Sequence, residues 1–117
     1  MSTLKNSQPF VNFSAIESQV DIALEAANQQ LNFLFGISPN SDFFTLESLQ
    51  DTTLKYQNQS TQMDILQQQC EHWLETEVLS KEQKTAIYQL EINGFKLHEL
   101  TEKIIAKLKR FHDNLEH

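Results

Sequence analysis

The sequence predicts an all-α fold, an antiparallel three-helix bundle in one domain. Its 117 residues fit one domain, and Gly and Pro together number only four, too few for the turns of a sandwich or barrel. Apolar residues also recur at spacings of three and four over long runs. We expect helices at about 14–36, 42–79 and 81–114, so that residues 14–114 form the bundle domain. An irregular N-terminal arm over residues 1–13 should precede it.

The first expected helix begins at a capping box. In Ser14-Ala15-Ile16-Glu17 the serine hydroxyl and the glutamate carboxylate would each accept a bond from a free backbone N–H group. Apolar residues then follow at helical spacing: Ile16, Val20, Ala23, Ala27, Leu31 and Leu34. Gly36 should end the helix in the left-handed conformation, and Pro39, which cannot lie inside a helix, marks the loop.

The second expected helix has caps of its own and an uneven core pattern. Ser41 or Asp42 would cap it, and two phenylalanines in its first turn would close that end of the bundle. Its register is apolar at both ends, but in the middle polar residues take core positions: Thr53, Ser60 and Gln67. A thin core is the favoured interpretation of this middle, and a polar layer that fixes the register is the alternative.

The third expected helix shows the most regular pattern. Ser80-Lys81-Glu82-Gln83 is a second capping box. A heptad stripe typical of coiled-coil packing follows: Ile87, Leu90, Gly94, Leu97, Thr101, Ile104, Leu108, Phe111 and Leu115. Asn93-Gly94 is the doubtful point. One continuous helix is favoured, and a break there, which would give a four-helix arrangement, is the alternative.

The expected helices differ in length, which points to an interaction surface. Two long helices and one short helix would leave part of the long pair uncovered, to be met by the N-terminal arm, a second copy or another partner. Large aromatic residues and the third helix's stripe are the candidate partner-binding residues. They are Phe43, Phe44, Trp73, Leu97, Ile104, Leu108 and Phe111.

Charge argues against nucleic acid as a partner. The net charge is −7; residues 1–80 carry ten acids and two lysines, hence −8, whereas residues 81–117 carry seven bases and six acids, hence +1. Four bases crowd the end of the third helix: Lys103, Lys107, Lys109 and Arg110. Complementing the helix dipole is the favoured interpretation, and an anionic partner, including the other half of this protein, is the alternative.

No residue pattern predicts catalysis, a cofactor or a metal. His72, His98 and His112 lack a glutamate three residues earlier, so the di-metal motif of helix bundles is missing. His98 and Glu102 share a helix face and are expected to form a surface pair. The acid that follows His98 argues against phosphotransfer. Cys70 falls in the apolar register and is expected to be a buried small hydrophobe.

Placement in the cell is predicted from similar absences. The sequence has no run of 18 apolar residues and therefore no expected transmembrane span, and it has no secretory signal. A single cysteine cannot form an intrachain disulfide, so a cytoplasmic location is expected. The final triplet, residues 115–117 (Leu-Glu-His), is typical of the start of an expression tag and is expected to be a remnant of one.

One stretch resembles phasins, small helical proteins that coat polyhydroxyalkanoate granules. The likeness lies in Phe33-Leu34-Phe35-Gly36-Ile37-Ser38, followed by Phe44, Leu46-Glu47-Ser48-Leu49 and a Gln-rich helix. It covers about 30 residues of the 117, and the chain departs in having Gln and Asn where phasins are rich in Ala. The resemblance implies adsorption to an apolar granule surface. The favoured function is a non-enzymatic helical protein-interaction module or homo-oligomer, and a granule coat is the alternative.

Overall fold

The chain folds into three long helices. The computed structural model describes residues 10–38 and 42–115, and structural statements below concern these residues. A short 3-10 helix, η1 (Phe10–Asn12), leads into α1 (Phe13–Phe35), followed by α2 (Leu46–Thr76) and α3 (Lys81–Leu115). No strand occurs in the described ranges, so the predicted all-α three-helix fold is confirmed.

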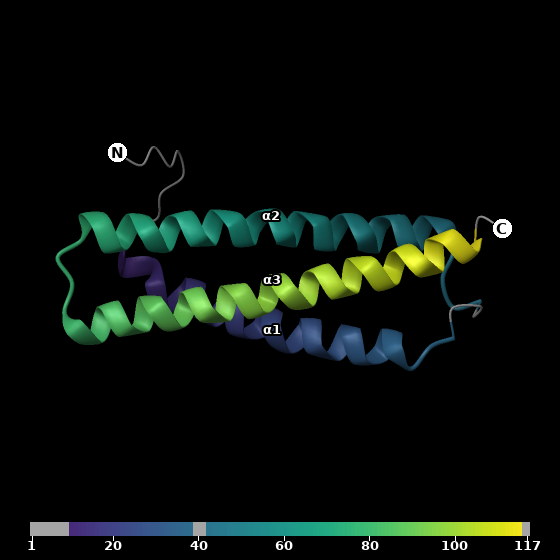
Figure 1. Cartoon of the computed structure of the whole chain (residues 1–117), viewed down its shortest axis with the longest axis horizontal. Helices are drawn as coiled ribbons and strands as arrows, with labels where there is room; N and C mark the ends of the chain where they lie inside the picture. The colour runs from purple at the N-terminus through teal and green to yellow at the C-terminus, as the bar shows by residue number, and fades with distance from the viewer. Residues whose placement is uncertain (1–9, 39–41, 116–117) are drawn as a thin grey trace.

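The helices run up, down and up, and α3 joins the other two. α1 and α3 point the same way and α2 runs antiparallel to both (Figure 1). α3 packs closely against α1 and against α2, whereas α1 and α2 make few close backbone contacts with each other. The bundle is therefore elongated, 56 × 26 × 17 Å. Each flank of α3 has a neighbouring helix, whereas no described element covers its outward side.

The heptad stripe of α3 is buried from Ile87 to Phe111, whereas Leu115 at its end is 44% exposed. Its seven residues from Ile87 to Phe111, apart from Gly94, are at most 2% exposed. Contacts between aromatic side chains close both ends of the bundle. The rings of Phe10 and Phe13 contact Trp73 at 5.6 and 5.8 Å, and Phe44 contacts Phe111 at 5.1 Å. The N-terminal segment thus takes the covering role that was one expected alternative.

The start of α1 differs from the expectation. The helix begins at Phe13, one residue before the expected cap, and its N-cap residue Asn12 makes no side-chain capping bond. The capping box at Ser14 and Glu17 is therefore absent, because η1 already winds the chain into the helix and places Ser14 inside the first turn. Residues 10–13 are thus helical rather than irregular, and residues 1–9 of the expected arm lie outside the described residues.

The end of α1 also corrects the sequence prediction. Gly36 is not left-handed, since its φ is −82° and its ψ −6°. Its N–H group donates to the carbonyls of Asn32 and Phe33 at 3.2 and 3.1 Å, which continues the right-handed winding past the last residue of α1. The loop leaves the helix without the positive φ that would require glycine.

α2 begins later than predicted because a different pair of residues caps it. The Thr45 hydroxyl accepts from the Ser48 N–H, and the Ser48 hydroxyl accepts from the Thr45 N–H, both at 3.0 Å. Serine here plays the reciprocal part usually taken by Glu or Gln. Phe43 and Phe44 consequently precede the helix instead of lying in its first turn. Asp42 is not the cap, and Ser41 lies outside the described residues.

The capping box before α3 is confirmed. The Ser80 N–H donates to Gln83 Oε1 at 2.7 Å, and the Gln83 N–H donates to the Ser80 hydroxyl at 3.1 Å. α2 has already ended at Thr76, so residues 77–80 form a short connection. α3 reaches Leu115, the first residue of the expected tag remnant, while residues 116 and 117 lie outside the described residues.

α3 is continuous through Gly94, as favoured, and tight packing explains the glycine. A Cβ atom at this position would lie 3.0 Å from Leu66 Cδ2 and 3.0 Å from Gln67 Nε2 on α2. The Gln67 amide in turn donates to the carbonyl of Glu91 at 3.3 Å. The missing side chain therefore lets α2 approach α3 closely, which offsets the helix propensity that glycine forfeits.

The middle of the α2–α3 interface is a polar layer, contrary to the thin core that the sequence favoured. Gln59 Nε2 donates to the hydroxyl of Thr101 at 2.8 Å, and Thr101, fully buried, donates to the carbonyl of Leu97. The Ser60 hydroxyl donates to Glu102 at 2.9 Å. Together with the bond of Gln67, these interactions satisfy two of the three polar residues that interrupt the apolar register, Ser60 and Gln67. They tie the two helices in one alignment.

Candidate partner-binding surfaces

Six of the seven candidate partner-binding residues lie in the core. They are Phe44, Trp73, Leu97, Ile104, Leu108 and Phe111, none more than 9% exposed. The prediction that these six residues form a free docking surface is therefore wrong. Their side chains pack in the core of their own chain. The heptad pattern identified the helix face that is buried within this chain, because intramolecular and intermolecular helix packing share one spacing.

Phe43, the seventh candidate, remains exposed, at 60%. Its ring packs edge-on against Phe33 and Phe44, with centroids 5.1 and 4.9 Å apart. A row of four rings thus runs from the surface at Phe33 to the buried Phe111. The two exposed rings of this row, Phe33 and Phe43, form an apolar patch at the end of the bundle where α1 ends.

The outward side of α3 carries an apolar stripe that the sequence analysis did not identify. Tyr88, Ile92 and Phe95 are 54%, 48% and 62% exposed. Their spacing of four and three places them on one helix face, about half a turn away from the buried heptad positions. We call these three residues the outer stripe. The signal was present in the sequence as a second apolar register, but the stronger heptad stripe masked it.

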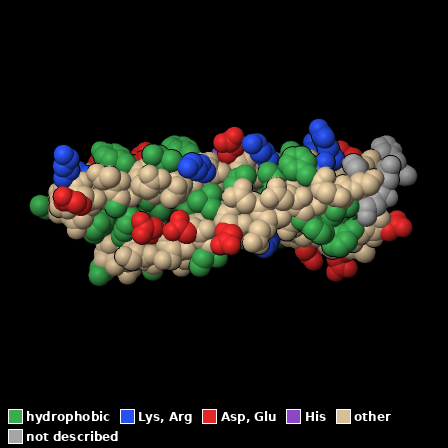
Figure 2. All heavy atoms as spheres, turned by 90° about the horizontal axis from the view of Figure 1, so that it is seen from below, with side chains coloured by type: hydrophobic (Ala, Val, Ile, Leu, Met, Phe, Trp, Pro, Cys, Tyr) green, Lys and Arg blue, Asp and Glu red, His purple; other side chains and the backbone are tan. Residues whose placement is uncertain are grey.

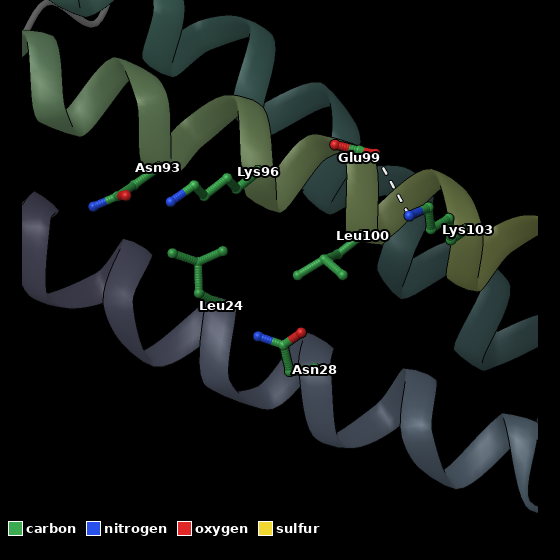
Figure 3. A pocket seen from close by; sticks show the side chains of 7 residues that line it. All are labelled: Leu24, Asn28, Asn93, Lys96, Glu99, Leu100 and Lys103. Carbon is green, nitrogen blue, oxygen red and sulfur yellow. Dashed lines mark ion pairs between the residues drawn. The ribbon is translucent and has the colours of Figure 1, made fainter.

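A shallow groove separates α1 from α3. It holds about 430 Å³ and is lined by Leu24 and Asn28 of α1 and by five residues of α3: Asn93, Lys96, Glu99, Leu100 and Lys103 (Figure 3). Leu24 and Leu100 point into the gap from opposite helices, and the side chains of Asn93 and Lys96 lie along its α3 side. The groove combines an apolar floor with amide and ammonium groups at its rim.

A second shallow groove, about 490 Å³, lies between α2 and α3. Leu54 and Ile105 supply its apolar surface, and Lys109 and His112 stand at one side of it. The remaining lining residues are uncharged polar groups of α2: Gln50, Thr53 and Gln57. This groove is less charged than the first and carries one lysine.

One polar cluster brings together a hydroxyl, an imidazole and a carboxylate. Ser60 Oγ lies 2.9 Å from Glu102 Oε1 and 3.5 Å from His98 Nδ1, and His98 Nε2 lies 3.8 Å from Glu102 Oε1. The expected surface pair of His98 and Glu102 is thus present. The Ser60 hydroxyl donates to the Glu102 carboxylate, and its 3.5 Å contact with His98 Nδ1 is at the outer limit of a hydrogen bond. The cluster links α2 to α3.

Cys70 is buried, as expected, and its thiol is held neutral. Burial, with the negative charges of Glu91 and Glu71, raises the pKa of the Cys70 thiol to about 12. Since the thiolate is the reactive form of cysteine, a thiol in this state is a poor nucleophile and a poor metal ligand. His72 Nδ1 is also buried and has no hydrogen-bond partner in the described part of the chain.

Metal and membrane sites were searched over the same residues. No three or more His, Cys, Asp or Glu side chains of the described ranges gather in a way that would hold a metal ion. None of the described helices has the length and apolar character required to cross a bilayer. Neither a protein-family model, nor a curated protein, nor a solved structure matches the chain.

Proposed function

We propose that the chain is a non-enzymatic protein-interaction module whose outer stripe on α3 binds a helix of a partner protein. The observation that carries this proposal is the exposure of Tyr88, Ile92 and Phe95 on one helix face. Helix-to-helix recognition commonly uses apolar anchors at positions i, i+4 and i+7, the spacing of this stripe. Two of the three are aromatic, a residue class favoured at the centres of interfaces. The lone buried cysteine supports the cytoplasm as its place of action.

The outer stripe alone is too small for a stable interface with any partner. An aromatic side chain buries roughly 150–250 Å² when fully covered, so three half-exposed side chains offer on the order of 300 Å². A stable interface takes about 800 Å² from each partner. Two outer stripes facing each other would fall well short. A partner that also covers the polar residues beside the stripe supplies the missing area.

Site-specific photocrosslinking in the native host tests the proposal. A photoreactive phenylalanine analogue replaces Phe95 in one strain and the exposed Gln68 of α2 in a matched control strain. We expect one discrete crosslinked product from position 95 and none from position 68. The variant Y88S/I92S should abolish the product at position 95 while leaving the helical circular dichroism unchanged. Equal crosslinking from both positions, or none from position 95, would refute a docking role for the outer stripe.

The granule-coat alternative has one structural observation in its favour. Apolar residues are also exposed on and next to α1, at Ile22, Phe33, Phe35 and Phe43. Reversible adsorption to a storage granule would use such a spread of apolar groups and not one stripe. Flotation of the purified chain with polyhydroxyalkanoate granules decides between the two. Protein that stays in the aqueous phase excludes the coat, and light scattering of the same sample measures whether the chain is monomeric.

A further inference from the structure

Four basic residues form a line along the flank of α3 that faces α1. Lys96, Lys103, Lys107 and Arg110 are separated by seven, four and three residues, so they share one side of the helix. At 1.5 Å per residue the line is about 21 Å long. We call these four residues the basic edge. In Figure 2 most Lys and Arg side chains follow one long edge of the face shown, and most Asp and Glu side chains lie away from it.

The basic edge is only partly neutralised by its own chain. Lys103 Nζ pairs with Glu99 at 3.5 Å, and Lys107 Nζ lies 5.3 Å from the centre of the Phe35 ring. Among the described residues, no carboxylate lies within ion-pair distance of Lys96 or Arg110. The four bases and Glu99 alone sum to +3, on a chain whose net charge is −7. Such a surplus is a local site for negative charge.

The basic edge borders the groove between α1 and α3. Lys96 and Lys103 line that groove together with Leu24 and Leu100, which form its apolar floor (Figure 3). Asn28 and Asn93 add two side-chain amides that can donate or accept hydrogen bonds. A ligand in this groove therefore meets aliphatic carbon below and positive charge along one side.

We propose that this groove and the basic edge bind an acidic amphipathic helix of a partner protein. Aliphatic side chains of the helix rest on Leu24 and Leu100. Its carboxylates, spaced by seven, four and three residues, pair with the four bases of the edge. The site lies on a flank of α3 and is distinct from the outer stripe, so this inference goes beyond the proposed function and does not depend on it.

Charge and shape both favour an acidic helix over other anionic partners. A nucleic acid or an anionic membrane extends beyond the 21 Å of the basic edge and would meet the acids of α1 and α2, which repel phosphate. A second copy carries the same net charge of −7, so two whole chains repel each other. The binding of a short acidic helix depends mainly on charges within about 8–10 Å of it, the screening length at physiological salt. A helix bound along the basic edge has the four bases within that distance.

A designed peptide tests the proposal on the full chain. The probe is a fluorescent 21-residue helix with glutamates spaced by seven, four and three residues and leucines along the adjacent face, and the control peptide has lysines in place of those glutamates. Fluorescence anisotropy should show binding of the glutamate peptide alone. The variant K96E/K103E should weaken that binding at least tenfold and should gain affinity for the lysine peptide. The matched variant K84E/K109E has the same net charge, but Lys109 lines the other groove; it should change the affinity less than twofold.

Several results would overturn the proposal. Equal losses from both double variants would mean that only net charge matters. Failure of the glutamate peptide to bind the wild-type chain, or tighter binding of a single-stranded oligonucleotide or of phosphatidylglycerol vesicles, would rule out an acidic helix as the ligand. Self-association of the chain that K96E/K103E abolishes would identify a second copy as the occupant. The outer-stripe variant Y88S/I92S should bind the glutamate peptide normally, so failure here and failure of the proposed function are distinguishable.

Discussion

Leu97 and Phe95, two residues apart on α3, test the division between its buried and outward sides. Leu97 is fully buried and Phe95 is 62% exposed. Truncating a buried leucine to alanine removes its transfer free energy and leaves a cavity, which costs about 2–5 kcal/mol. We therefore expect L97A to lower the free energy of unfolding by about 3 kcal/mol. Phe95 loses little burial on truncation and gains the helix propensity of alanine, so F95A should change stability by less than about 0.5 kcal/mol.

The two variants are compared by thermal and urea unfolding, followed by circular dichroism at 222 nm. With an unfolding entropy of about 2.1 cal/mol/K per residue, a chain of this length loses about 4 °C in Tm for each kcal/mol. L97A should thus unfold about 12 °C below the wild type, and F95A within about 2 °C of it. Binding to the partner should show the opposite order, with F95A defective and L97A normal below its Tm. A destabilisation by F95A equal to that by L97A would refute the assignment of the two sides.

Two further predictions concern the caps and the cysteine. S80A removes the hydroxyl that accepts from the Gln83 N–H and should cost about 1 kcal/mol, whereas S14A, at a position with no capping bond, should be neutral in the same urea titration. For Cys70, the folded chain keeps a proton up to a pH of about 12 that the unfolded chain releases near its ordinary pKa, so folding stability should fall as pH rises through that interval. The variant C70A should show a shallower decline, and identical slopes for the two chains would contradict this account.

The elements themselves could be predicted from the sequence because each rests on local information. The spacing of apolar residues gave three helices, and the reciprocal groups of Ser80 and Gln83 gave the start of α3. The start of α2 was misplaced because Thr45 and Ser48 do not match the usual capping pattern, although their bonds are equivalent to it. A continuous helix through Gly94 was favoured, but the reason for the glycine could not be predicted, because it is the proximity of Leu66, 28 residues away along the chain.

The candidate site was harder to predict than the fold for a physical reason. A heptad stripe predicts that a helix face is buried, but it does not predict whether the helices that cover this face belong to the same chain. For Leu97, Ile104 and Leu108 the covering residues are intramolecular. The outer stripe has the same kind of spacing but only three members, and it became recognisable once both flanks of α3 were seen to be occupied.

The place of α3 in the bundle connects the two proposed surfaces. α1 and α2 both depend on α3 for their packing, so the buried side of α3 is committed to stability and its substitutions act on folding. The outward side of α3 carries the exposed apolar residues of the outer stripe, and the flank that faces α1 carries the four bases of the basic edge, of which Lys103 forms an ion pair with Glu99. Exposed apolar groups and unpaired like charges contribute little to the stability of a monomer. Their concentration on α3, the helix that packs against both of the others, is the reason why we propose this helix as the interaction surface of the chain.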